Sequence, residues 1–237
     1  MPKMSSEVAS PFQRSTLNGP TMGTRWSASV DTDDSVNQKA LHQGLAAAVQ
    51  QVDAQMSPWK QGSDLVRLNR APVGAWVDLP PEMLEVLTCA MDIHRLSAGA
   101  FDPCVGALVD AWGFGAVRDA PDAAAIHTAR QAVPCTMHKG LELDRTAGRA
   151  CKRAPVQIDL CGIAKGYAVD RMAQVLQQHG VLHALASLDG ELRAVGEVVD
   201  LCLDLLGVDV VEGDLAGGTA DQRCVGDRCS DRPGAHD

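Results

Sequence analysis

The composition of the chain changes abruptly at residue 197, and this change limits the part of the sequence that can form a packed core. Residues 197–237 carry ten acidic and three basic side chains, whereas residues 1–196 carry 20 acidic and 18 basic ones. The last aromatic residue is Tyr167, and the acidic segment is rich in Gly and Asp without a sustained apolar period. Such asymmetry is typical of an interaction tail or a disordered end. We therefore expect the folded part to end near residue 196.

Upstream of that point the chain has the character of a globular protein. Its 237 residues allow one or two domains. The 46% hydrophobic and 22% charged residues exclude a disordered, collagen-like or coiled-coil chain. No apolar run is long enough for a transmembrane helix. The net charge of −9 argues against nucleic acid as a partner. The N-terminus lacks the apolar stretch of a signal peptide, so we expect a cytoplasmic protein with reduced thiols.

Common catalytic and metal motifs are missing from the sequence. The eight cysteines occur singly without a C-x-x-C pair, which disfavours both a zinc site and a disulfide scaffold. The seven histidines form no H-E-x-x-H motif, and there is no G-x-S-x-G elbow. The function must therefore be sought in less standard clusters.

Hydrophobic periodicity predicts an α+β fold without a strict βαβ rhythm. Apolar residues recur at helical spacing over three segments, 37–56, 81–96 and 162–178, and Gly180 ends the last of them. Alternation predicts strands at 24–30, 156–160, 182–188 and 191–195, with a weak one near 140–143. The turn between the last two strands is Asp189-Gly190.

Two clusters in the first third of the chain combine loop residues with a projecting side chain. Gly19-Pro-Thr-Met-Gly-Thr24 predicts a turn that presents Met22. Met56-Ser-Pro-Trp59 ends the first helix, and a Trp on such a loop can stack on a flat aromatic ligand. Residues 63–69 either extend this ligand loop or form a helical turn capped by Ser63.

Two further clusters lie in the second half. Residues 99–106, with Trp112-Gly-Phe-Gly115, form either a loop whose backbone approaches a flat ligand or a Gly-hinged hydrophobic corner. Residues 158–170 predict a strand leading into a helix, whose N-terminal N–H groups and dipole suit a phosphate. Lys165 near that end is unfavourable for the dipole but favourable for a bound anion, and this conflict indicates a function. The glycine spacing matches neither a Walker loop nor a dinucleotide fingerprint.

In their order along the chain, the four clusters resemble the ApbE-type FAD:protein FMN transferases. The resemblance extends from Gly19 to Gly196, and Asp159-Leu-Cys-Gly-Ile-Ala-Lys-Gly-Tyr-Ala-Val-Asp170 is its most specific part. It implies a single ApbE-like α+β domain with a mixed β-sheet core and flanking helices. It also implies that the protein binds FAD and Mg²⁺, cleaves the FAD pyrophosphate and attaches FMN to a threonine. That threonine would belong to an acceptor flavoprotein, a subunit of a redox complex.

The resemblance assigns roles to single residues but names no catalytic one. It implies that these residues contact FAD: Met22, Trp59, Ala100, Phe101, Asp102, Asp159 and Lys165. Within this set, the loop Ala100–Asp102 would hold the adenine end and Met22 would lie against the flavin nucleotide. The backbone carbonyl of Gly162 would bind Mg²⁺, which neutralises charge on a leaving phosphate.

The sequence departs from the family pattern at single positions and after residue 196. Cys104 replaces Thr, Ala107 replaces Pro, Cys161 replaces Ser or Gly, and Asp189 interrupts a Gly-Gly pair. The family's later segments, which supply side-chain ligands for magnesium, have no counterpart in the acidic segment. We therefore expect a flexible N-terminus over 1–18, an incomplete ApbE-like domain over 19–196, and a tail over 197–237 that derives from a frameshift or a truncated gene. Two alternatives to an active transferase stay open, namely a FAD-binding protein without transfer activity and a non-functional fragment.

Overall fold

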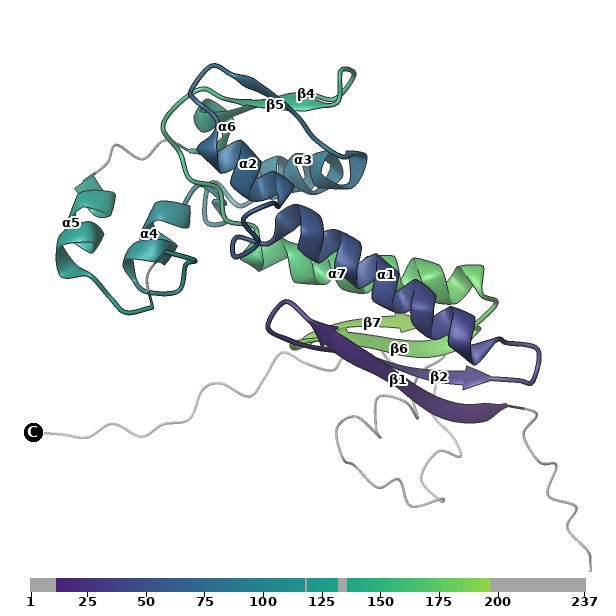
Figure 1. Cartoon of the computed structure of the whole chain (residues 1–237). Coiled ribbons are helices and arrows are strands. Elements are labelled where there is room, and N and C mark those ends of the chain that lie inside the picture. The colour runs from purple at the N-terminus through teal and green to yellow at the C-terminus, as the bar shows by residue number, and fades with distance from the viewer. Residues whose placement is uncertain (1–11, 118, 132–135, 197–237) are drawn as a thin grey trace, which may run out of the picture. The chain divides into compact units, whose positions relative to one another are not determined.

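The computed structural model describes residues 12–117, 119–131 and 136–196, all within one compact unit, Met1–Cys202. The expected acidic tail lies outside the described residues. Helices and strands alternate irregularly in an α+β fold (Figure 1). The helices are α1 (Gln38–Met56), α2 (Asp64–Arg70), α3 (Pro81–Leu96), α4 (Gly106–Ala111), α5 (Ala123–Gln131), α6 (Met137–Gly140) and α7 (Cys161–Gln178). The strands are β1 (Gln13–Thr21), β2 (Thr24–Thr32), β3 (Trp76–Asp78), β4 (Leu141–Asp144), β5 (Arg149–Lys152), β6 (His183–Leu188) and β7 (Glu191–Val195).

The larger sheet, here called sheet A, is antiparallel with the strand order β1-β2-β6-β7. Each of its two hairpins turns through two residues with positive φ, Met22 and Gly23 in one and Asp189 and Gly190 in the other. Such turns match the twist of the flanking strands. Because β2 pairs with β6 and Trp26 lies opposite Leu188, both turns lie at the same end of sheet A.

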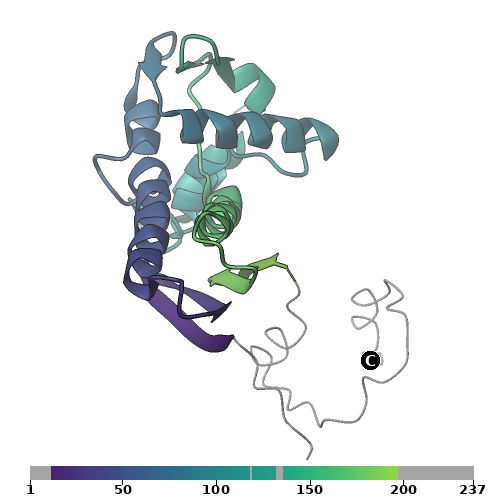
Figure 2. The ribbon, with the colours of Figure 1, turned by 90° about the vertical axis from the view of Figure 1, so that its right-hand side faces the viewer.

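Helices α1 and α7 pack against each other and cover one face of sheet A (Figures 1 and 2). The alternation in β2 directs Trp26, Ala28 and Val30 into this layer, where all three are buried. The predicted helices are confirmed. Asn37 caps α1 with its side chain, and the backbone N–H of Gly180, at positive φ, closes the end of α7.

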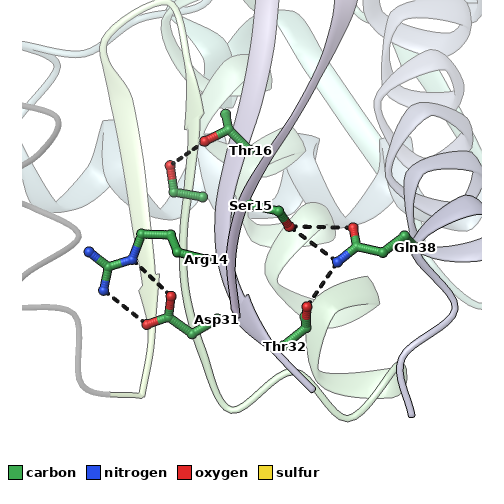
Figure 3. Close-up of polar contacts among 7 residues, drawn as sticks. Arg14, Ser15, Thr16, Asp31, Thr32 and Gln38 are labelled. Atoms are coloured by element: carbon green, nitrogen blue, oxygen red, sulfur yellow. Dashed lines mark hydrogen bonds and ion pairs between the residues drawn. The ribbon is translucent and has the colours of Figure 1, made fainter. Parts of the chain in front are cut away.

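The N-terminal edge strand β1 was not predicted. The expectation of a flexible terminus up to residue 18 is wrong from Gln13 onward, because the backbone of this segment pairs with β2. Its outward side chains are polar, so no apolar alternation marks it as a strand. These side chains form the contacts shown in Figure 3, in which Arg14 Nε donates to Asp31 Oδ1 at 2.8 Å. On the other face, Gln38 Nε2 donates to Thr32 Oγ1 at 2.8 Å and ties α1 to the sheet.

A smaller antiparallel sheet, sheet B, has the order β3-β5-β4 and packs with α2. Its strands β3 and β5 were not predicted, and β4 confirms the weak strand expected near 140–143. The inward stripe of α3, including Met83, Leu87 and Ala90, joins the same core as sheet A. Among the described helices, none is both long enough and apolar enough to cross a membrane.

The segment 156–160, predicted as a strand, forms no strand and has only an isolated bridge between Gln157 and Val105. The physical reason is that other groups satisfy its backbone. The side chain of Asn69 accepts from Ile158 N and donates to Ile158 O, both at 2.8 Å, and Pro103 O accepts from Asp159 N at 2.8 Å. A neighbouring strand is therefore not needed to pair these buried polar groups.

Candidate functional site

The loop after α3 and the start of α7 meet at one place. Asp159 N donates to Pro103 O at 2.8 Å, and Gly106 N donates to Gln157 O at 3.0 Å. Above this junction the ring of Phe101 lies over Gly162, because a Cβ added to Gly162 would stand 3.4 Å from Phe101 Cε2. Residues about 60 positions apart in sequence thus form one surface at the N-terminal end of α7.

Two aspartates hold the backbone turns on either side of this junction. Asp102 Oδ1 accepts from Cys104 N, and Asp159 Oδ1 accepts from Cys161 N, each at 2.9 Å. Both carboxylates are therefore oriented by their own loops. Burial raises the pKa of the Cys161 thiol to about 12, and the negative charge of Asp159 adds to the shift. The thiol next to the helix N-terminus is consequently protonated at neutral pH.

Lys165 lies one turn into α7 and connects the helix to the hairpin ends of sheet A. Its Nζ forms an ion pair with Asp189 Oδ2, and Asp189 Oδ1 accepts from Thr24 Oγ1 at 3.3 Å. The hydrogen bond to Asp189 raises the pKa of Lys165, and Lys165 lowers the pKa of Asp189. Both groups are therefore charged at neutral pH. Asp189, which departs from the family pattern, is thus the residue that forms an ion pair with Lys165.

Met22 occupies the neighbouring hairpin turn with a φ of 45° and packs, partly buried, against the core. The turn expected over 19–24 is therefore confined to Met22 and Gly23, and Gly19 lies within β1. Because the two hairpin turns share one end of sheet A, Met22 lies at the same end as Asp189 and its partner Lys165.

Trp59 is positioned separately, on the loop between α1 and α2, and its side chain is 52% exposed. Its backbone N–H donates to Ser57 Oγ at 3.3 Å, and Ser63 Oγ donates to Ser57 O at 2.7 Å. Ser63 also caps α2, so the capped-helix interpretation of 63–69 is confirmed. Pro58, next to Trp59, lines a cleft of about 290 Å³ that also contains Asp159.

Comparison with known proteins identifies the family of this site. The family model described as ApbE matches residues 22–201. The chain belongs to the ApbE family. A FAD:protein FMN transferase of Klebsiella pneumoniae is 33% identical over 195 residues, covering 79% of this chain and 55% of that protein. One of Haemophilus influenzae is 30% identical and covers 78% of this chain and 55% of that protein.

Solved structures of the family agree with the fold of this ApbE-family chain. The apo form of the flavinyl transferase ApbE of Pseudomonas stutzeri superimposes with a TM-score of 0.71 at 31% identity, covering 79% of this chain and 62% of that one. The flavin transferase ApbE of Vibrio cholerae gives a TM-score of 0.71 at 29% identity and covers 78% and 60%. The α+β class is confirmed. The chain spans about half the length of the curated relatives it matches.

The described residues of the ApbE-family chain do not by themselves complete a magnesium site. The described ranges hold no cluster of three or more His, Cys, Asp or Glu side chains that could bind a metal ion. The expected ligand, the Gly162 carbonyl, is a single neutral oxygen. The carboxylate closest to it in sequence, Asp159, already accepts from Cys161 N. Mg²⁺ prefers six oxygen ligands and usually keeps carboxylates and phosphates among them.

Asn69 lies in the last turn of α2. It belongs to the segment 63–69, but the sequence predicts no functional role for it. Its side-chain amide forms two hydrogen bonds with the backbone of Ile158, one residue before Asp159. Its own carbonyl accepts from the buried Lys152 Nζ at 2.5 Å. The only hint in sequence is that Asn is a poor helix former. Asn69 therefore holds the approach to α7 in place.

Replacing Asn69 by leucine is expected to lower the free energy of unfolding by about 2–4 kcal/mol, because both backbone groups of Ile158 lose their partner. Urea unfolding followed by circular dichroism measures the effect. The matched control is Asn18→Leu in β1, whose exposed side chain accepts from Arg25 Nη2 at 2.5 Å, and a loss of about 1 kcal/mol or less is expected. Equal effects of the two substitutions would contradict the role given to Asn69.

Proposed function

We propose that this ApbE-family chain acts as a FAD:protein FMN transferase, which moves FMN from FAD to a threonine of an acceptor flavoprotein. The observation that carries the proposal is the junction at the N-terminal end of α7, where the Phe101 loop is hydrogen-bonded to Asp159 through Pro103 O. The residues that meet there are those for which the family resemblance implies contact with FAD. The names of the relatives support the same activity.

The N-terminal end of α7 supplies the electrostatic part of the proposed FAD site. No acidic side chain lies in its first turn, and its N-cap residue Leu160 forms no side-chain cap. Cys161 N already donates to Asp159 Oδ1 and Ile163 N to Leu160 O, so it is the positive end of the helix dipole that favours a diphosphate here. Lys165 adds a full positive charge one turn away, with 29% of its side chain exposed.

Aromatic side chains supply the apolar part. Phe101 is partly buried, and its Cε2 lies beside Gly162 at the start of α7, where an apolar ring can contact a bound nucleotide. Trp59 is half exposed, and a flat ring can stack on it without displacing core residues. We assign the Ala100–Asp102 loop to the adenine end of FAD and Met22 to the flavin nucleotide, following the family resemblance.

The proposed reaction replaces the phosphoanhydride bond of FAD by a phosphoester bond to the acceptor. The threonine oxygen of the acceptor forms a bond to the phosphorus of the FMN half, and the pyrophosphate P–O bond breaks. AMP leaves with that electron pair, and the threonine proton is released to solvent or to AMP. The chain's part is to bind and orient FAD so that the phosphorus faces the acceptor.

Mg²⁺ would neutralise charge on the leaving phosphate. Among the described residues only the Gly162 carbonyl is assigned to it, so the ion would depend on FAD oxygens and water for most of its ligands. The poor donor set favours a second candidate, a FAD-binding protein that does not transfer FMN.

One mixture tests the proposal: the purified full chain, FAD, MgCl₂ and an acceptor domain carrying a target threonine. We expect the acceptor to carry a covalently bound, fluorescent flavin and to gain the mass of one FMN group. The control acceptor has the target Thr replaced by Val and should gain nothing.

The same mixture separates the alternatives. Bound FAD without labelled acceptor supports the second candidate and contradicts the transferase. If FAD neither binds nor shifts a broad thermal unfolding transition, the chain is a non-functional fragment. If FMN is transferred, candidate acceptors can be tested one by one. The family resemblance implies that the acceptor is a subunit of a redox complex.

A further inference from the structure

A buried histidine lies beneath the loop that carries Phe101. His94 belongs to the last turn of α3 and is only 5% exposed, whereas its neighbours Ile93 and Arg95 are exposed. Its Nδ1 lies 2.8 Å from the carbonyl oxygen of Phe101. A carbonyl can only accept, so Nδ1 carries the hydrogen and donates it. The proposed function assigns no role to this residue.

The loop over His94 has an unfavourable backbone that needs support. Ala98 and Gly99 both have positive φ, at 51° and 85°. For Ala98 this is a left-handed conformation that residues with a Cβ avoid. Gly99 N donates to His94 O at 2.9 Å, and a Cβ on Gly99 would stand 3.5 Å from His94 Cε1. The loop is therefore folded tightly onto the imidazole and the helix end.

The far side of the loop is fixed from the same helix end. Phe101 N donates to Ser97 Oγ at 3.1 Å, while Phe101 O accepts from His94. Both backbone polar groups of Phe101 are thus held by side chains at the C-terminal end of α3. The carboxylate of Asp102 also faces the imidazole, with 3.9 Å between Asp102 Oδ2 and His94 Nδ1.

The imidazole is itself held in place. The ring of His138, in α6, meets the ring of His94 edge-on at 5.4 Å between centroids. A core ring with a fixed orientation can transmit that orientation to the peptide to which it donates. This peptide joins Phe101, whose Cε2 lies beside Gly162, to Asp102, whose carboxylate accepts from Cys104 N.

We propose that His94 is a positioning residue for FAD binding, because its Nδ1–H fixes the peptide between Phe101 and Asp102. This inference rests on the proposed function, in which the Ala100–Asp102 loop contacts FAD. His94 acts through the loop and does not touch the reacting atoms.

Two substitutions of His94 separate the hydrogen bond from the bulk of the ring. His94→Leu keeps apolar volume but removes the donor, whereas His94→Asn places an N–H group near the position of Nδ1. His127→Leu, on the exposed face of α5, is the matched control. For each full-length variant, hydrogen exchange of amides 99–104 is measured without FAD, and the dissociation constant for FAD is measured by flavin fluorescence.

We expect His94→Leu to raise both amide exchange in 99–104 and the dissociation constant for FAD about tenfold, the effect of one well-formed hydrogen bond. His94→Asn should restore most of the affinity, although its smaller side chain loses more packing than that of the Leu variant. Such a rescue would not follow from a merely structural role. His127→Leu should change neither quantity.

Three outcomes overturn parts of the proposal separately. If His94→Leu stays folded and changes neither exchange nor affinity, His94 has no positioning role. If both His94 variants weaken FAD equally, bulk rather than the hydrogen bond matters, and the inference fails. If the unsubstituted chain binds no FAD, the proposed function fails, and the exchange data still decide whether His94 holds the loop.

Discussion

Replacing Trp26 by alanine is expected to lower the free energy of unfolding by about 3–5 kcal/mol, the range typical of a large buried aromatic residue. The indole is 1% exposed and lies opposite Leu188 in the central strand pair of sheet A. Its ring contacts that of His42 in α1, with 5.3 Å between centroids. A Cβ on Gly19 would stand 2.8 Å from Trp26 Nε1, so the edge strand closes over the ring as well. Alanine would leave a cavity bounded by three elements.

Chemical denaturation monitored by far-ultraviolet circular dichroism measures this loss. The chain offers a matched control in Trp112→Ala, because Trp112 follows α4 and is 42% exposed. We expect that control to cost about 1 kcal/mol or less. A Trp26 variant as stable as the control would mean that the ring does not join sheet A to α1. If the Trp26 variant is unfolded at the outset, Trp26→Phe, which keeps an aromatic ring, should recover a cooperative transition.

Replacing Lys165 by glutamine is expected to weaken FAD binding by about 10–100-fold, because a charge-assisted hydrogen bond contributes about 1.5–3 kcal/mol. The hydrogen bond to Asp189 raises the pKa of Lys165, so the amine is positive at neutral and mildly alkaline pH. The same partner must be displaced or shared when a diphosphate arrives. Asp189→Asn removes the competing charge, and we expect it to leave FAD affinity unchanged or to increase it.

Titration of flavin fluorescence at neutral pH and low salt tests both variants. Lys139→Gln removes one positive charge from an exposed lysine in α6 and controls for the change in net charge. The affinity of the unsubstituted chain should fall with added salt, and that of the Lys165 variant should fall less steeply. Should Asp189→Asn weaken FAD as much as Lys165→Gln, Asp189 would be an aid to binding instead of a competitor.

The long amphipathic helices could be predicted to within about a residue because each presents one apolar stripe to the core. In α7, the stripe includes Ala164, Ala168 and Met172, and Gly180 marks its end. Strand β1 could not be predicted because an edge strand with polar outward side chains lacks an apolar alternation. Strand β3 is only three residues long, and its pairing with β5 depends on residues that are distant in sequence.

In the candidate site, too, some residues could be predicted from the sequence and others could not. The structure brings the loop of Phe101 next to Asp159, and the family resemblance assigns contacts with FAD to both residues. Asn69 and His94 have no such signature. A polar residue on a short helix is usually solvated, and a lone histidine near a helix end usually interacts with the dipole. Their roles depend on backbone groups that only the folded chain brings within reach, such as the carbonyl of Ile158 for Asn69.

The strand order of sheet A has a consequence for how the chain folds as it is made. Strand β2 is synthesised early, but its inner partner β6 follows only after sheet B and α7. Until His183 pairs with Asp31, the β2 edge of the hairpin β1-β2 is open. Such non-local pairing slows folding, and an unpaired strand edge is where nascent chains associate with each other. Between translation of β2 and translation of β6, the hairpin therefore has an edge through which nascent chains can associate.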